Sequence, residues 1–474
     1  MDSATVLNIF KEITRIPRES GHEGPMTAYL QQFAASHGLE CRTDAIGNVN
    51  IIKPAAPGKE AVPTLVLQGH QDMVCEKIGG FVHDFRKDPI PYVIEDGWMI
   101  AKNTTLGADD GIGVAACLAL LESDLPTGRL ECVFTISEET GMDGAFGMEP
   151  GFFTGKTLIN LDSEDEGQLF IGCSGGIDTR ITFHYGTEPL KDGWTVLKVK
   201  IANAIGGHSG DDINKGRLNA VQQMARYLFR EVREGMQLIH LSGGNKPNAI
   251  ARECEAVIAV ADPKAAKARL KELADAIRKE FAVTDPNVTC TSRVVPSKAA
   301  AVEGAVARRL IDALYACPHG VTAMSQDIPG LVETSTNLAA VRMEEPGIIS
   351  VITNQRSSIP SARHFIANRV EAVFSLAGAE VEHLLEYPGW TPNVHSHILE
   401  TCVAAYRKLF QAEPEVKAIH AGLECGLFGE KFGDLDMISF GPTLRGVHAP
   451  GEKLELASLD KFWDLLADVV TNLK

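Results

Sequence analysis

The chain has 474 residues, of which 45% are hydrophobic and 23% are charged, so it carries enough apolar side chains for folded cores and is not a mainly disordered protein. Its 45 basic and 62 acidic residues give a formal net charge of −17, which argues against nucleic acid or an anionic membrane surface as the main partner. A chain of this length predicts two or three domains.

The cysteine pattern and the apolar runs bear on the cellular compartment. The ten cysteines form no CxxC pair and no dense framework, which indicates reduced thiols rather than a disulfide scaffold. The first residues lack a continuous apolar segment, and no run of 18 apolar residues follows anywhere in the chain. We therefore expect a cytoplasmic protein with no membrane partner.

The first third of the chain alternates between helix and strand patterns. Apolar residues at helical spacing predict helices over residues 6–16 and 26–37. Continuous apolar runs at 62–68, 130–136 and 157–161 predict strands that are buried on both faces, and a helix rich in small residues is predicted over 111–121, between the first two strands. This alternation predicts an α/β domain with a mixed, largely parallel sheet.

The pattern changes after residue 176. Alternating polar and apolar residues at 179–183 and 196–201 are typical of half-exposed antiparallel strands. We predict an inserted α+β lid domain over residues 177–387, with the catalytic domain formed by 1–176 and 388–474. The remaining elements predicted are helices over 218–232, 263–281, 397–409 and 458–473, and strands over 256–261 and 436–440.

Ionisable side chains follow the predicted buried strands of the first domain. His70 and Asp72 follow one strand, Glu138 and Glu139 a second, and Asp162 a third. In α/β sheets, ligands bind beyond the carboxyl ends of the strands, and imidazoles and carboxylates are the ligands expected for zinc or manganese. Taken singly, a strand-end Asp is commonly a helix N-cap, and paired glutamates can form a solvated turn. Several such strand ends in one chain favour a metal site.

Five motifs resemble those of the co-catalytic zinc exopeptidases, and within that clan the aminoacyl-histidine dipeptidases. They are His70-Gln71-Asp72-Met73-Val74, the segment Thr105 to Gly113, the segment Ser137 to Ala145, Asn160-Leu161-Asp162-Ser163-Glu164 and Gly206-Gly207-His208-Ser209-Gly210. The segment Ala421 to Phe428 is particularly similar to that subgroup, and the resemblance extends from Ile9 to Leu465.

The resemblance implies a pair of zinc ions, for which Mn²⁺ or Co²⁺ could substitute. His70 and Asp162 would hold one ion, Glu139 and His448 the other, and Asp109 would bridge them. The resemblance further implies that Glu138 is the general base and that Asp72 orients the ring of His70. The resemblance also implies a cis peptide bond between Asp109 and Asp110.

Further positions resemble substrate contacts of the family. His208 would stabilise the oxyanion, whereas the alternative is a turn histidine with local partners. Asn248, Arg252 and Arg356 resemble substrate-contact positions, and an arginine there would suit the substrate's free carboxylate. The alternative for the arginines is a surface salt bridge. Glu424 would bind the free α-amino group, or it is a loop carboxylate at a helix N-terminus.

We therefore expect a dinuclear metal-dependent dipeptidase that hydrolyses small unblocked peptides, including Xaa-His dipeptides. The alternatives are an N-acyl amino acid deacylase and a catalytically inactive relative that acts by binding. The resemblance also implies a homodimer formed through the lid domain.

Overall fold

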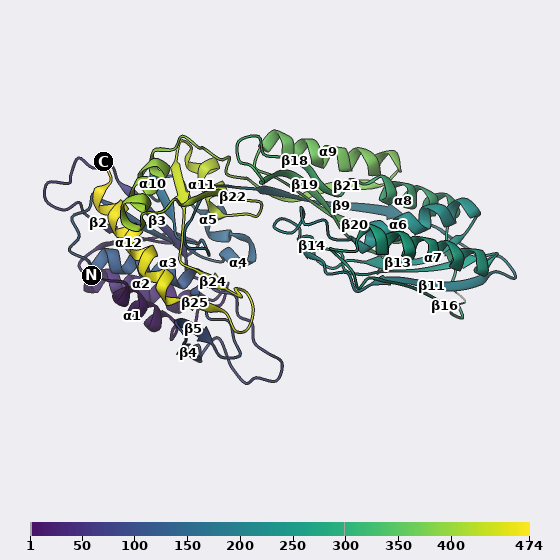
Figure 1. Ribbon diagram of the computed structural model, residues 1–474, viewed down its shortest axis with the longest axis horizontal. Helices are drawn as coiled ribbons and strands as arrows, with labels where there is room; N and C mark the ends of the chain where they lie inside the picture. The colour runs from purple at the N-terminus through teal and green to yellow at the C-terminus, as the bar shows by residue number, and fades with distance from the viewer. Residues whose placement is uncertain (1, 298) are drawn as a thin grey trace. The chain divides into compact units, whose positions relative to one another are not determined.

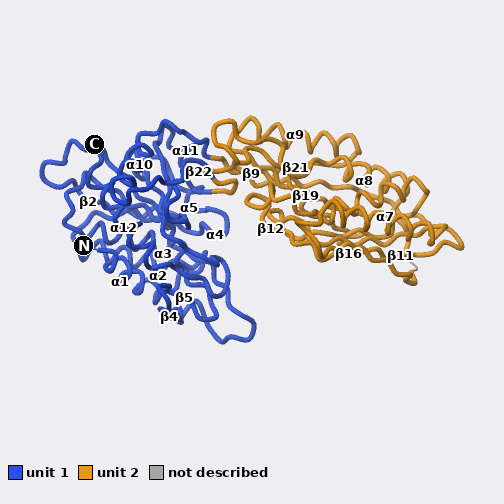
Figure 2. Tube along the Cα trace, in the orientation of Figure 1, with its two compact units in different colours: residues 1–172, 390–418, 423–474 blue, residues 173–389, 419–422 orange. Residues whose placement is uncertain are grey.

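The computed structural model describes residues 2–297 and 299–474, and the chain forms two compact units (Figures 1 and 2). The first unit comprises residues 1–172, 390–418 and 423–474, and the second comprises 173–389 and 419–422. These limits differ from the predicted boundaries after residues 176 and 387. Gly175 and Gly176 already pair with a strand of the second unit, and the Ser174 N–H donates to carbonyls of Ile419 and Ala421, which draws residues 419–422 into that unit.

The first unit is built around a mixed sheet with the strand order β1-β2-β6-β3-β7-β23-β8-β22. Parallel pairing is concentrated at its centre, where β6, β3, β7 and β23 lie side by side. The predicted mixed α/β architecture is confirmed. The strands of this sheet are β1 (Glu40–Thr43), β2 (Val49–Lys53), β3 (Leu65–His70), β6 (Leu130–Thr135), β7 (Thr157–Asn160), β8 (Gln168–Cys173), β22 (Glu415–Ile419) and β23 (Asp436–Ser439).

Helices with buried apolar side chains pack in the first unit. In α1, residues at helical spacing such as Val6, Ile9 and Ile13 are buried, and the helix packs on α3, which in turn packs on β3. Helix α3 starts at Ala108, three residues before the predicted start, and almost all of it is buried. The helices of the first unit are α1 (Ser3–Ile13), α2 (Gly24–Ser36), α3 (Ala108–Glu122), α4 (Glu138–Gly141), α5 (Asp143–Gly147), α10 (His397–Phe410), α11 (Glu424–Phe432) and α12 (Leu456–Asn472).

A smaller antiparallel sheet completes the first unit and was not predicted. Its strand order is β24-β25-β5-β4, with β4 at Tyr92–Glu95, β5 at Trp98–Ala101, β24 at Leu444–Arg445 and β25 at Lys453–Glu455. The strands are short, so their alternation is hard to detect in the sequence. This sheet joins the segment after β3 to the segment that carries His448.

The second unit contains a long antiparallel sheet with the order β16-β11-β15-β13-β19-β20-β9-β21, and β18 pairs with β19. Helices α6 and α8 contribute apolar side chains to its core, including Leu228 and Leu310. The predicted antiparallel strands and helices over 177–387 are present. The elements are β9 (Gly175–His184), β10 (Thr187–Glu188), β11 (Thr195–Ala202), β12 (Gly207–His208), α6 (Ala220–Glu231), η1 (Val232–Glu234), β13 (Gln237–Gly243), β14 (Ala249–Ile250), β15 (Cys254–Val260), α7 (Pro263–Glu280), β16 (Thr289–Val294), β17 (Ala301–Val302), α8 (Gly304–Ala316), β18 (Gly320–Met324), β19 (Val332–Arg342), β20 (Ile348–Ser357), α9 (Pro360–Leu376) and β21 (Glu380–Tyr387).

Among the described residues, no helix combines the length and the apolar character that a membrane crossing requires.

Candidate metal centre

The carboxyl ends of β3, β6 and β7 form one edge of the first unit's sheet, because these strands are parallel neighbours. His70 is the last residue of β3, Glu138 and Glu139 begin α4 three residues after β6, and Asp162 follows β7 by two residues. Asp109 lies at the start of α3. The apolar residues that form the strands thus place the ionisable residues after them at a common edge.

One group of side chains forms around His70. Its Nε2 atom lies 3.0 Å from Asp109 Oδ1 and 3.5 Å from Asp162 Oδ1. The candidate ligand atoms of these three residues all lie within 4.8 Å of one another, which is close enough for one ion to contact all three. His70 is fully buried, so the cluster is shielded from solvent on the imidazole side.

A second group shares Asp109. His448 Nε2 lies 3.0 Å from Asp109 Oδ2 and 3.0 Å from Glu139 Oε2. These three residues again bring ligand atoms within 4.8 Å of one another. Each oxygen of the Asp109 carboxylate therefore faces a different imidazole, so Asp109 joins the two groups. The chain brings His448 here although it lies 339 residues from Asp109 in the sequence.

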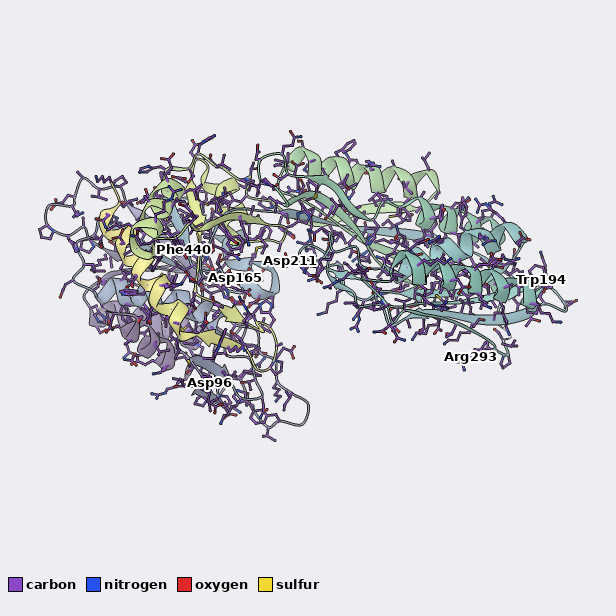
Figure 3. All side chains as sticks on the ribbon, in the orientation of Figure 1. Asp96, Asp165, Trp194, Asp211, Arg293 and Phe440 are labelled. Carbon is purple, nitrogen blue, oxygen red and sulfur yellow. The ribbon has the colours of Figure 1, made fainter. Side chains whose placement is uncertain are left out.

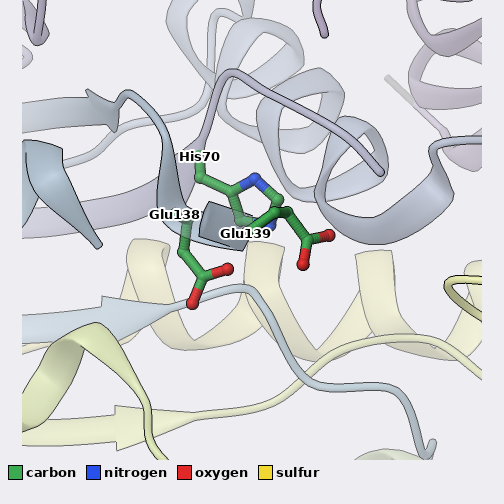
Figure 4. Close-up of side chains that lie close together, drawn as sticks. All are labelled: His70, Glu138 and Glu139. Atoms are coloured by element: carbon green, nitrogen blue, oxygen red, sulfur yellow. The ribbon is translucent and has the colours of Figure 1, made fainter. Parts of the chain in front are cut away.

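A third group consists of His70, Glu138 and Glu139, whose side chains lie close together (Figure 4). Glu138 follows Ser137, whose left-handed backbone (φ 50°) makes the sharp turn between β6 and α4. Glu138 and Glu139 are thus neighbours in the chain and both approach the imidazole of His70. By geometry alone Glu138 could act as a ligand as well as a base.

The carboxylate of Asp72 contacts both the His70 ring and the backbone of the glutamate pair. Its Oδ1 atom lies 3.2 Å from His70 Nδ1 and accepts the N–H of Glu138 at 3.0 Å, and its Oδ2 atom accepts the N–H of Glu139 at 3.2 Å. A hydroxyl donor, Ser20 Oγ, lies 2.7 Å from the same Oδ2. One buried carboxylate therefore holds the backbone of the glutamate pair and lies beside the imidazole of His70.

The charge balance of the cluster is negative. Burial raises the pKa of Asp162 well above its ordinary range, and the nearby Asp109 carboxylate raises it further. Burial also raises the pKa of Glu138, with Glu139 adding to the effect. Hydrogen bonds with Asp109 and Glu139 raise the pKa of His448 to about 11. The carboxylates of the cluster thus outnumber the positive groups that could balance their charge.

These donors fit a pair of divalent cations. If the neutral His70 ring carries its proton on Nδ1, the atom beside the Asp72 carboxylate, its Nε2 atom presents a lone pair to two carboxylate oxygens, which is unfavourable unless a cation lies among them. In addition, the buried Oε1 atom of Glu139 has no hydrogen-bond partner within the described part of the chain. Nitrogen and carboxylate oxygen are the ligand types of zinc and manganese sites.

Two buried residues that support Asp109 and its loop could not be identified from the sequence. Glu452 accepts the N–H groups of Leu106, Gly107 and Ala108 at 2.7, 3.0 and 2.8 Å. Arg18 donates to the carbonyls of Asp72 and Gly107. Both residues are far from their partners in the sequence, and an isolated Glu or Arg is no signal of such a contact.

Asp110 is a third supporting residue, and here the neighbouring glycines were a signal. Its carboxylate accepts the N–H of His70 and the N–H of Gly113, both at 3.2 Å. A Cβ at Gly69 or Gly113 would lie 2.2 or 2.3 Å from an oxygen of Asp110, so only glycine fits. The peptide bond between Asp109 and Asp110 is cis, as the resemblance implies.

His208 and Arg356 belong to the second unit and share Ser209 as a neighbour. Arg356 is buried, and its Nε atom donates to Asn354 Oδ1 at 2.9 Å and Ser209 Oγ at 3.3 Å, while Nη1 donates to the hydroxyl of Tyr387 at 2.9 Å. The interpretation of Arg356 as a surface salt bridge is therefore wrong. Its partners are neutral and it is buried.

The imidazole of His208 is held by its own turn. Its Nδ1 atom accepts the N–H groups of Gly210 and Asp211, both at 3.3 Å, and lies 3.3 Å from the carboxylate of Asp211, which Figure 3 labels. If Nδ1 accepts, the remaining proton of the neutral ring is on Nε2. His208 thus has local partners and still offers one N–H donor.

Asn248 and Arg252 lie on the segment that pairs with His208. The carbonyl of Asn248 accepts the N–H of Ser209 at 2.8 Å, and its side chain is exposed. Arg252 is also exposed and its Nε atom donates to the carbonyl of Ala204 at 3.3 Å. Both residues therefore border the turn of His208, and the described residues include no ion-pair partner for Arg252.

Glu424 is the first residue of α11 and is fully buried in the first unit. Its Oε2 atom accepts hydrogen bonds from Gln68 Nε2 at 2.6 Å and Thr135 Oγ1 at 2.8 Å. Its Oε1 atom is buried and has no hydrogen-bond partner among the described residues. Burial raises the pKa of Glu424 to about 7. Glu424 therefore lies at a helix N-terminus, as the alternative has it, but within the helix rather than a loop and with its side chain enclosed.

Comparison with known proteins gives matches along nearly the whole chain. The sequence model of peptidase family M20/M25/M40 matches residues 66–472. The chain is 38% identical to the cytosol non-specific dipeptidase of Escherichia coli strain K12 over 467 residues, which cover 98% of this chain and 96% of the relative.

Solved structures agree with this match. The crystal structure of aminoacylhistidine dipeptidase from Vibrio alginolyticus is similar with a TM-score of 0.89 at 38% identity, covering 99% of this chain and 97% of that chain. Aminopeptidase PepT from Bacillus cereus has a TM-score of 0.61 at 16% identity, covering 100% of this chain and 99% of that one, so it shares the fold.

Proposed function

The chain belongs to peptidase family M20/M25/M40, and from that membership we propose that it is a dinuclear metal-dependent dipeptidase. Its substrates would be small dipeptides with a free amino terminus, including aminoacyl-histidine dipeptides. The names of the relatives from Escherichia coli and Vibrio alginolyticus support this substrate class. The expectation of a cytoplasmic protein is supported by the word cytosol in the first name.

The observation that carries the proposal is the shared carboxylate of Asp109. Its two oxygens each lie 3.0 Å from a different imidazole, and each imidazole also faces a further carboxylate, from Asp162 or Glu139. This donor set would hold one zinc ion with His70 and Asp162 and a second with Glu139 and His448. When bound, such a pair of ions polarises a peptide carbonyl and acidifies water.

Glu138 would act as the general base. Its backbone N–H is fixed by Asp72, so its carboxylate stays beside the candidate ligands. We propose that one carboxylate oxygen of Glu138 takes a proton from the attacking water and then delivers it to the amine nitrogen of the leaving amino acid. Asp72 would keep the His70 ring in its orientation throughout.

The remaining candidates would bind and orient the dipeptide. His208 would donate its Nε2–H to the carbonyl oxygen as negative charge develops there. Arg356 would bind the substrate carboxylate, with Asn248 beside the same turn, and Glu424 would accept the ammonium group through its free oxygen. A site that binds both termini selects dipeptides. From the resemblance we also propose that the second unit acts as a lid and forms a homodimer.

A substrate panel tests this function. Purified protein should hydrolyse free Ala-His and other free dipeptides, and should hydrolyse the N-acetylated forms of the same dipeptides poorly. Prolonged treatment with EDTA should abolish the activity, and zinc, manganese or cobalt should restore it. Preference for N-acetylated substrates would instead indicate a deacylase, and an absence of metal-dependent hydrolysis would indicate an inactive binding relative.

A further inference from the structure

A row of buried polar side chains crosses the centre of the first unit's sheet. Gln68 on β3, Asn160 on β7 and Ser439 on β23 are register partners on neighbouring parallel strands, and all three are fully buried. Register partners point to the same face, so these side chains lie next to one another. Buried polar groups are costly unless they are paired, and apolar residues would fill a sheet interior at lower cost. We call these three residues the polar ladder.

Along the polar ladder, each side chain donates a hydrogen bond to the next, starting from Ser439. The backbone N–H of Asp162 can only donate, and it donates to Asn160 Oδ1 at 3.3 Å. This contact identifies the oxygen of the Asn160 amide, so the hydroxyl of Ser439 donates to the same atom. The amide nitrogen of Asn160 then donates to Gln68 Oε1 at 2.6 Å.

The direction carries through to Glu424. Because Gln68 Oε1 accepts from Asn160, its Nε2 atom must face the other way, and it donates to Glu424 Oε2 at 2.6 Å. Thr135 Oγ1 donates to the same oxygen. Two donors therefore bind Oε2, whereas the buried Oε1 atom has no hydrogen-bond partner in the described residues. A buried carboxylate oxygen without a donor is unfavourable unless a ligand supplies one.

We propose that the polar ladder is the positioning element for recognition of the substrate's amino terminus, with Gln68 as a specificity-determining residue. The ladder fixes Oε2 of Glu424 and leaves Oε1 free for an ammonium group. The same Asn160 oxygen binds the N–H of Asp162, so the ladder also ties Glu424 to the backbone of a candidate metal ligand. This inference rests on the proposed dipeptidase function and on Glu424 as the contact to the amine.

The test is the ratio of kcat/KM for a free dipeptide to kcat/KM for its N-acetylated form. Gln68→Met keeps the length of the side chain and removes the donor to Glu424. We expect KM for the free dipeptide to rise about tenfold or more, because a hydrogen bond to a charged group is lost. The kcat/KM for the N-acetylated form should stay within about twofold, so the ratio falls. Bound metal per chain should not change.

Gln355→Met is the matched control. Gln355 is also a fully buried amide in a sheet, with donors and acceptors on Thr179, Thr336 and Thr353, but it lies in the second unit and has no link to Glu424. It should leave the ratio unchanged. If Gln68→Met does not fold, Ser439→Ala removes the far end of the ladder and should lower the ratio by a smaller factor.

The outcomes separate this inference from the proposed function. If the wild-type protein hydrolyses free dipeptides in preference to acetylated ones and Gln68→Met keeps that ratio, the ladder has no role in specificity. An equal loss on both substrates, with loss of metal, would assign Gln68 a structural role only. If the wild-type protein does not discriminate, both the amine contact and the ladder are excluded.

Discussion

The two units each place a histidine among carboxylates, with opposite electrostatic results. In the first unit, burial and neighbouring carboxylates raise the pKa of Asp162. In the second unit, burial opposes ionisation of Asp211, but the neighbouring imidazole of His208, 3.3 Å from the carboxylate, and the charge of Arg356 lower its pKa. The first cluster has an excess of negative charge, whereas an arginine balances the second.

This difference indicates what each cluster can bind. Anionic donors that lack counter-charges favour cations, since each added positive charge relieves repulsion among buried carboxylates. In the proposed function, the buried guanidinium and the imidazole N–H of the second cluster would bind the carboxylate and the carbonyl oxygen of a substrate. The four predictions that follow test this division of labour between metal binding and substrate binding.

The largest effect should come from the base in the first cluster. Glu138→Ala should lower kcat by about 10⁴-fold, because it removes the group that takes and returns the proton. Metal analysis of the same sample should still find close to two ions per chain. Loss of both ions would instead make Glu138 a ligand, which the third group with His70 and Glu139 also permits.

The second largest effect should come from the second cluster. His208→Ala should lower kcat by about 10²–10³-fold, because the oxyanion loses a hydrogen-bond donor. Steady-state kinetics on a free dipeptide measure this change. His184→Ala is the control, since His184 is an exposed histidine paired with a glutamate in the same unit. Activity near wild type in the His208 variant would return that residue to a local turn role.

A smaller effect is expected from Glu452, which supports the loop of Asp109 in the first cluster. Glu452→Gln should weaken metal binding by about 10–100-fold, because the loop of Asp109 loses the carboxylate that accepts its N–H groups. Titration of the apoprotein with zinc measures this affinity. Glu131→Gln is the matched control, since Glu131 is buried in the same unit and accepts the N–H groups of Thr154 and Gly155. Equal losses in both variants would contradict a specific role for Glu452.

The smallest effect should come from a conservative change in the second cluster. Arg356→Lys should raise KM for free dipeptides about tenfold with little change in kcat, because an ammonium cannot reproduce the fork that binds a carboxylate. Kinetics at several substrate concentrations separate the two constants. Arg269→Lys, which alters an arginine paired with Glu231 elsewhere in the same unit, should leave KM unchanged. A fall in kcat alone would argue against a carboxylate contact.

Much of the fold could be predicted because its signals are local. The apolar runs before His70, Glu138 and Asp162 predicted three central strands, and β6 and β7 begin at the predicted residues. In the smaller sheet only the pairing of β25 with β5 joins segments far apart in the chain, whereas β4 and β5 form a local hairpin whose Asp96-Gly97 turn was a sequence signal that was missed. The observed domain boundaries differ from the predicted ones because the Ser174 N–H donates to carbonyls of residues 419 and 421, which are distant in the sequence.

The sequence by itself determined the ligand types and the α/β pattern, because residue chemistry and hydrophobic periodicity are local properties of the chain. Its motifs also resemble a family, and that resemblance implies how the ligands are grouped. Only the tertiary structure decided that Asp109 faces His70 and His448 at equal distances and that Glu452 supports its loop. It also decided that one oxygen of Glu424 stays free. Such contacts join residues hundreds of positions apart, and they depend on packing that no local pattern encodes.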